Sequence, residues 1–151
     1  MRIYAGSDHA GFELKQALVA EARRLGHEVV DLGPASAERV DYPDFGAAVG
    51  RAVAKDPGSR GVLACGSGIG IGIAANKVPG VRAATVWDEE SARLSRQHND
   101  ANVFSVGARL VPAERALAML RAWLAAEFEG GRHATRVEKI AALERTPAGR
   151  D

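Results

Sequence analysis

The single cysteine of the chain, Cys65, ends a short apolar run and precedes the segment Gly-Ser-Gly-Ile-Gly-Ile-Gly at residues 66–72. A thiolate there can act as a general base or as a nucleophile, and the start of a following helix favours its charge. Glycines let backbone N–H groups approach and point at an anion. The segment therefore predicts an oxyanion or phosphate cradle beside a reactive sulfur. A plain strand-to-helix turn and a buried, inert cysteine are the alternatives.

Three established glycine-loop and cysteine-loop chemistries do not match this segment. The dinucleotide fingerprint would require glycine in place of Ile71 or Ile73, and a nucleotide P-loop requires a Gly-Lys pair, which the sequence lacks. A cysteine phosphatase loop would require arginine six residues after the cysteine, where Ile71 stands. We therefore expect no nucleotide or redox cofactor.

The other candidate groups are histidines, arginines and one aspartate. Asp8 and His9 follow the first apolar run, where a site role and a turn role fit equally. His98 falls in the last turn of an expected helix, where a histidine can merely complement the helix dipole. Arg132 and Arg136 follow two glycines and suit a phosphate group, although a solvated charged turn fits their spacing nearly as well. No grouping of histidine, cysteine and carboxylates has metal-ligand spacing, so no metal is expected.

The composition limits the class of protein. The 151 residues are 46% hydrophobic, which suffices for one self-contained core. The 20 Lys and Arg nearly balance the 19 Asp and Glu, so no broad basic surface for nucleic acid is expected. No 18-residue apolar run could span a membrane, and the amino-terminal residues lack a signal-peptide pattern. Together with a cysteine that has no internal partner, these features predict a cytoplasmic protein.

Short apolar runs alternate with amphipathic stretches, which predicts βα units that build a parallel sheet. We expect strands at residues 2–5, 28–31, 61–65, 83–87 and 102–106. The expected helices include one with Pro43 in its first turn, one that begins near Ser67, one capped by Asp88 and one opened by Pro112 that reaches Phe128. Thr135 is expected to cap a last helix. In open parallel sheets ligands bind beyond the carboxyl ends of the strands, so the loops after the first and third strands are the expected site.

Several ordered blocks of the sequence resemble the type B ribose-5-phosphate isomerase family, which also includes galactose-6-phosphate and allose-6-phosphate isomerases. The resemblance covers roughly residues 1–143, through the blocks at residues 6–15, 41–45, 65–77, 96–102 and 128–133. It implies an α/β protein with a Rossmann-like three-layer α/β/α sandwich, a five-stranded parallel sheet and a C-terminal helix. We expect one domain over residues 1–144 and a flexible tail over residues 145–151.

The resemblance also implies an activity and residue roles. The activity is metal-free and cofactor-free interconversion of ribose 5-phosphate and ribulose 5-phosphate through a cis-enediol, in the pentose phosphate pathway. Cys65 would be the base between C1 and C2, and one family branch instead uses a glutamate where this chain has Ile71. Further matches are Ser67, Gly66, Gly68 and Gly70 for the enediolate oxygen, Asp8 and His98 for ring opening, His9, Arg109, Arg132 and Arg136 for the phosphate, Asn99 for sugar hydroxyls, and Tyr42 as an aromatic near the pocket.

Helix geometry predicts how these residues are divided. A helix that follows a parallel strand runs back toward the amino edge of the sheet, so His98 is expected roughly 15 Å from the carboxyl edge that holds Cys65. Both cannot touch one sugar within one chain. We therefore predict a homodimer in which His98 and Asn99 enter the neighbouring subunit's pocket. The resembling family's dimers, often paired into tetramers, agree.

Two other functions compete with this one. A six-carbon sugar phosphate, such as allose or galactose 6-phosphate, could be the substrate, since the catalytic groups would be the same. A non-catalytic phosphosugar-binding module would keep the arginines but would not need Cys65 and His98. The presence of both residues argues against such a module. A single chain that carries Cys65, His98 and the arginines favours the pentose enzyme over galactose-6-phosphate enzymes, which divide these residues between two different chains.

Overall fold

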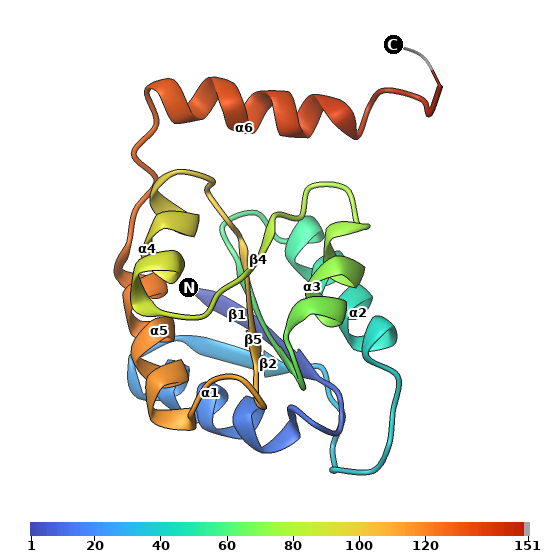
Figure 1. Cartoon of the computed structure of the whole chain (residues 1–151), viewed down its shortest axis with the longest axis vertical. Helices are drawn as coiled ribbons and strands as arrows, with labels where there is room; N and C mark the ends of the chain where they lie inside the picture. Colours follow the sequence, from blue (N-terminus) through green and yellow to red (C-terminus); the bar gives the residue numbers. More distant parts are fainter. Residues whose placement is uncertain (150–151) are drawn as a thin grey trace.

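The computed structural model describes residues 1–149 as a parallel sheet between helices (Figure 1). The strand order is β2-β1-β3-β5-β4, and every pairing is parallel. This confirms the predicted α/β fold with a five-stranded sheet. The strands are β1 (Arg2–Ser7), β2 (Glu28–Asp31), β3 (Arg60–Cys65), β4 (Ala83–Thr85) and β5 (Val103–Gly107). The helices are α1 (Phe12–Arg24), α2 (Tyr42–Lys55), α3 (Ile69–Asn76), α4 (Glu89–Gln97), α5 (Ala113–Ala125) and α6 (Arg132–Leu143).

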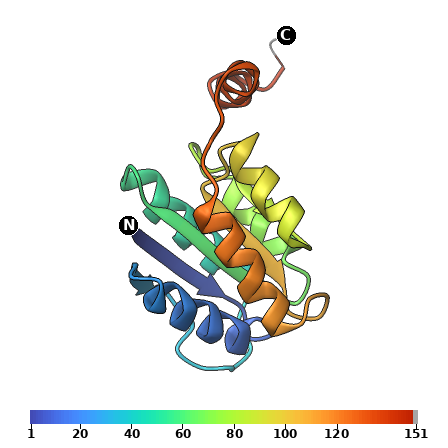
Figure 2. The same ribbon diagram turned by 90° about the vertical axis from the view of Figure 1, so that its left-hand side faces the viewer.

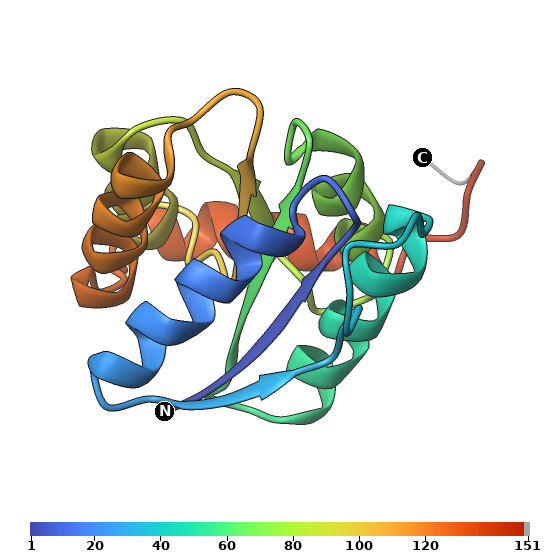
Figure 3. The same cartoon turned by 90° about the horizontal axis from the view of Figure 1, so that it is seen from below.

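Helices cover both faces of the sheet. Helices α1, α4 and α5 lie on one face and α2 and α3 on the other (Figure 3). Successive residues of β3 alternate between the two cores: Val62 packs on the α1 and α5 side, and Leu63 packs on the α2 and α3 side. Trp123 and Phe104 are fully buried, and burial of each such side chain contributes roughly 1.5–3 kcal/mol to stability.

Most helix starts agree with the predicted caps. Pro43 stands in the first turn of α2, and Asp88 caps α4 through a reciprocal capping box with Ser91. The prediction for the last helix was wrong, because α6 begins at Arg132 and Thr135 lies inside it. The fifth helix ends at Ala125, before the predicted Phe128.

Helix α6 stands away from the layered body (Figures 1 and 2). It crosses the amino edge of the sheet, where the Gly80 N–H donates to the Glu144 carboxylate at 2.9 Å and the Glu129 N–H donates to the Gln97 carbonyl at 3.0 Å. Ile140 and Leu143 are 43% and 72% exposed. The helix therefore leaves apolar side chains uncovered in the single chain. Of the tail predicted over residues 145–151, Arg150 and Asp151 lie outside the described residues. Among residues 1–149, the helices are too short or too polar to cross a membrane.

Candidate functional site

The loops after β1, β3 and β5 meet at the carboxyl edge of the sheet (Figure 3). The Asp8 N–H donates to the Ala64 carbonyl at 3.3 Å, which joins the first loop to the end of β3. The Ala108 N–H donates to the Cys65 carbonyl at 2.9 Å, which joins the third strand to the loop after β5. Three loops are thus in contact beyond the strand ends, where the sequence predicts the site.

Cys65 is the last residue of β3, and its side chain is 4% exposed. It packs with the core on the α2 and α3 side. Its sulfur is also the acceptor of a hydrogen bond from the Gly68 N–H at 3.1 Å. The sulfur therefore faces the start of α3, and a backbone donor points at it as it would at a thiolate.

The glycine loop is locked in place by hydroxyl groups from the neighbouring strands. Gly68 caps α3 in the left-handed conformation, with φ 76°, and a Cβ there would lie 2.6 Å from the Val106 backbone. Its carbonyl accepts hydrogen bonds from Ser105 Oγ at 2.6 Å and Thr85 Oγ1 at 3.1 Å. Glycine is therefore required at this position, and the hydrogen bonds to its carbonyl preorganise the loop.

Further predicted residues gather around this loop. The Tyr42 ring packs on Gly70, and the Arg109 guanidinium lies over Gly66. Both contacts are so close that a Cβ on either glycine would lie 3.1 Å or less from those groups. The carboxylate of Asp8 accepts the Gly11 N–H at 2.9 Å. The structure thus places nine predicted residues at the carboxyl edge: Asp8, His9, Tyr42, Cys65, Gly66, Ser67, Gly68, Gly70 and Arg109.

The remaining predicted residues lie at the opposite edge. His98 is the C-cap of α4, at the amino end of β5, whereas Cys65 pairs with Gly107 at the far end of that strand. The four steps from Val103 to Gly107 span roughly 13 Å. Asn99, Arg132 and Arg136 lie at the amino edge with His98 and are separated from Cys65 in the same way. The structure agrees with the predicted division of the candidate residues between two edges.

His133 is a candidate that the sequence interpretation did not include. It is 6% exposed, and its ring stacks on His98 with centroids 4.1 Å apart and planes 11° from parallel. Its position between Arg132 and Arg136 was visible in the sequence, but its contact with a residue of another helix was not. Glu129 lies 3.7 Å from its Nε2. The donor atoms of His98, Glu129 and His133 lie within 4.8 Å of one another, but the near-parallel rings favour stacking over chelation.

The burial of His133 and the charges around it predict that the docking of α6 is sensitive to pH. Burial, and then the charges of His98 and Arg132, lower the pKa of His133 below its usual 6.5. The undocked imidazole binds a proton more readily, so docking is favoured at neutral pH and weakens as the pH falls below 6.5. We expect faster hydrogen exchange of the α6 amides at pH 5.5 than at pH 7.5, after correction for intrinsic rates. His133→Gln should remove this difference, and equal protection of the wild type at both pH values would contradict it.

Comparison with known proteins identifies the family. The chain matches the Ribose/Galactose Isomerase family over residues 3–140. It is 50% identical over 143 residues to ribose-5-phosphate isomerase B of Escherichia coli (strain K12), covering 95% of this chain and 96% of that protein. The structure of ribose-5-phosphate isomerase B from Clostridium thermocellum matches with a TM-score of 0.92 and 50% identity, covering 96% of this chain and 98% of that chain. The Mycoplasma genitalium enzyme with bound ribulose-5-phosphate matches with a TM-score of 0.92 and 41% identity, covering 95% and 96%. This chain therefore belongs to the ribose/galactose isomerase family.

Proposed function

We propose that this protein interconverts ribose 5-phosphate and ribulose 5-phosphate through a cis-enediol, with Cys65 as the base. Membership of the family makes the protein an isomerase. The pentose is supported by the names of its relatives and by the ribulose-5-phosphate bound to one of them. The observation that carries the mechanism is the sulfur of Cys65 at the start of α3, beside the preorganised glycine loop.

The proposed reaction moves one proton from C2 to C1 and one from O2 to O1, and it needs no other reactant. Cys65 takes the proton from C2 of the open-chain aldose, the C2–H electron pair forms the C1–C2 double bond, and O1 becomes negative. Ser67 and the first N–H groups of α3 lie where they can stabilise that oxygen. Return of the proton from Cys65 to C1, together with transfer of the O2 proton to O1, gives the ketose.

Four of the predicted phosphate, ring-opening and sugar-binding residues can reach a sugar at Cys65 only from a second copy of the chain. A five-carbon sugar phosphate is shorter than the sheet from edge to edge, so it cannot contact Cys65 together with His98 or Arg136 of the same chain. A partner that offers its amino edge to the carboxyl edge of this chain would supply all four missing groups: His98, Asn99, Arg132 and Arg136. We therefore propose a homodimer with shared active sites.

Exposed apolar side chains support this assembly. Ile69 and Ile73 of α3, Trp87 and Leu110 are each more than half exposed. An apolar cleft of about 370 Å³ is lined by Ile69, Trp87 and Leu110 and also by Ser67 of the glycine loop. Contiguous apolar surface of this kind marks an interaction site. Its position next to the proposed active site is where a partner subunit would have to lie.

Comparison of substrates is the direct test of the proposed function. Initial rates are measured with ribose 5-phosphate, allose 6-phosphate and galactose 6-phosphate, together with exchange of the C2 proton in D2O. We expect the highest kcat/KM with ribose 5-phosphate. A preference for a hexose phosphate would contradict the pentose assignment, and binding without proton exchange would identify a non-catalytic binding module.

Arg136→Ala is expected to weaken substrate capture more than turnover. Arg136 is exposed on α6, where its guanidinium can pair with a phosphate in the partner's pocket. Loss of a charge-assisted hydrogen bond costs roughly 1.5–3 kcal/mol, which is about a tenfold to hundredfold increase in KM. Lys139→Ala, one turn further along the same helix, is the control and should leave KM unchanged. Equal KM values for Arg136→Ala and the wild type would place the phosphate elsewhere.

A further inference from the structure

The connection from α4 to β5 carries His98 and Asn99 and then turns at Asp100. Asp100 has φ 48°, and among residues 1–149 it is the single non-glycine residue in the left-handed region. A residue with a side chain rarely adopts this conformation, although Asp and Asn tolerate it best. The Ala101 N–H donates back to the Ser95 carbonyl at 2.9 Å, so the chain reverses tightly here. The orientation of His98 and Asn99 therefore depends on what holds this turn.

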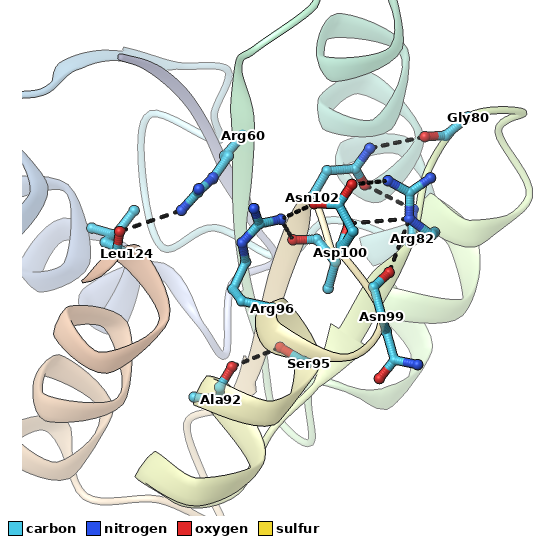
Figure 4. Close-up of polar contacts among 11 residues, drawn as sticks. Arg60, Gly80, Arg82, Ala92, Ser95, Arg96, Asn99, Asp100, Asn102 and Leu124 are labelled. Atoms are coloured by element: carbon cyan, nitrogen blue, oxygen red, sulfur yellow. Dashed lines mark hydrogen bonds and ion pairs between the residues drawn. The ribbon is translucent and has the colours of Figure 1, made fainter. Parts of the chain in front are cut away.

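Two arginines from separate segments hold the carboxylate of Asp100, and we call these three residues the Asp100 clamp (Figure 4). Arg96 of α4 contacts Oδ1 through Nη1 at 2.9 Å. Arg82, which precedes β4, contacts Oδ2 through Nη2 at 3.2 Å. Because each carboxylate oxygen has its own guanidinium, the side chain cannot rotate or shift without losing a charged contact.

The same arginines also bind the backbone of the turn. Arg82 Nε donates to the carbonyls of Asn99 and Asp100, each at 3.1 Å. Arg96 Nη1 donates to the Ala101 carbonyl at 2.7 Å. The side-chain amide of Asn99 points away from the clamp (Figure 4), and Asn99 is exposed. The clamp thus fixes the Asn99 backbone and leaves its side chain available to a neighbouring molecule.

Burial makes the carboxylate charge important. The side chains of Arg96, Arg82 and Asp100 are 9%, 23% and 34% exposed. A third cation, Arg60, lies over the Trp123 ring at 5.2 Å. Burial and the charge of Arg96 lower the pKa of Arg60 to about 10, and Asp100 acts in the opposite direction. Loss of the Asp100 charge would leave Arg96 buried without a carboxylate partner among residues 1–149, and the turn would have to rearrange.

We propose that the Asp100 clamp positions His98 and Asn99 for reaction in the partner's pocket. This inference rests on the proposed function, because it assigns the clamp to the half of the shared site that one subunit gives to the other. Arg82, Arg96 and Asp100 are positioning residues, and none of them needs to touch the sugar phosphate. If these residues had a purely structural role, their substitution would lower stability without slowing one step of the reaction more than another.

The test uses the variant Asp100→Asn. It compares turnover of ribose 5-phosphate, which needs ring opening, with proton exchange of ribulose 5-phosphate, which does not. Asparagine keeps the shape and the tolerance of the left-handed conformation but removes the charge. Ribose 5-phosphate arrives as a furanose, whereas ribulose 5-phosphate is open because its 5-oxygen is phosphorylated. Misplacement of the ring-opening group should lower turnover of ribose 5-phosphate on the order of tenfold to a hundredfold. Exchange of the C1 proton of ribulose 5-phosphate in D2O should fall much less.

Glu21→Gln is the matched control. Glu21 is also a buried carboxylate between two arginines, Arg24 at 2.6 Å and Arg121 at 2.8 Å, but these three residues belong to α1 and α5 and not to the connection from α4 to β5. Its neutralisation should leave both rates unchanged. If Asp100→Asn does not fold, Arg82→Lys repeats the comparison with the charge kept and the guanidinium fork removed. Equal losses in both rates, or no loss in either, would overturn the positioning role. A wild type that does not isomerise ribose 5-phosphate would instead contradict the proposed function.

Discussion

Cys65→Ser is expected to lower kcat for ribose 5-phosphate by about a thousandfold, the middle of the range for loss of a general base. The hydroxyl of serine is a far poorer base than a thiolate near pH 7, and the buried position beneath the Gly68 N–H offers it no other activating group. The variant should still bind ribulose 5-phosphate, because its arginines and glycine loop are intact. A discontinuous assay measures kcat for ribose 5-phosphate, and calorimetry measures the binding of ribulose 5-phosphate.

The thermal midpoint and a second variant, Cys65→Ala, separate loss of the base from loss of the folded structure. Serine is close to cysteine in size, so the thermal midpoint of the variant should stay near that of the wild type, and Cys65→Ala should lose as much turnover as Cys65→Ser. Proton exchange between ribulose 5-phosphate and D2O should fall in parallel with turnover, because both need the same base. A Cys65→Ser variant with wild-type kcat would reject Cys65 as the base and leave it as a core residue at the end of β3.

The carboxyl-edge half of the site could be predicted from the sequence because it depends on local signals. Glycines after an apolar run predict a strand-to-helix loop, and parallel strands bring such loops to one edge. The structure confirms this for Cys65 and Gly68, and the contact between the Asp8 loop and the end of β3 follows from the pairing of β1 with β3. The strand order itself depends on which strands pair across the sheet, which spacing along the chain does not encode.

The differences at element ends also have local causes. The fourth strand was expected to reach residue 87 but ends at Thr85, because the Trp87 N–H donates to Ser91 Oγ and belongs to the cap of α4. Gly130 and Gly131 both have positive φ and allow α6 to begin directly at Arg132, ahead of the Thr135 signal. Capping motifs compete with one another, and the sequence does not say which of them is used.

The amino-edge half of the site was predictable in position but not in detail. Helix length alone placed His98 away from Cys65, and the pairing of Cys65 with Gly107 at the far end of β5 agrees. The stacking of His133 on His98 and the clamp around Asp100 each join segments that are distant in sequence. Contacts of this kind follow from tertiary packing, so residue type and spacing could not predict them.

A mixture of two inactive variants, Cys65→Ala and His98→Ala, is expected to recover activity. In a heterodimer with shared sites, one site combines Cys65 from the second variant with His98 from the first, and the other site lacks both. Random exchange of equal amounts makes half of the dimers mixed, so about a quarter of wild-type activity should return. The measurement is turnover of ribose 5-phosphate after the subunits are exchanged by mild denaturation and refolding, with tagged chains to count heterodimers.

The matched control mixes Cys65→Ala with Cys65→Ser. Both variants lack the base, so their heterodimers contain no complete site and should stay inactive at the same extent of exchange. Recovery in the first mixture alone would mean that Cys65 and His98 act together across the subunit boundary. This is expected because the two residues lie at opposite ends of β5, too far apart for one small substrate to contact both within a single chain. If counted heterodimers of the first mixture showed no activity, His98 and Cys65 would have to serve the same site from one chain. His98, at the C-cap of α4, would then have to move toward Cys65, at the end of β3, by roughly 13 Å, which is the length of β5.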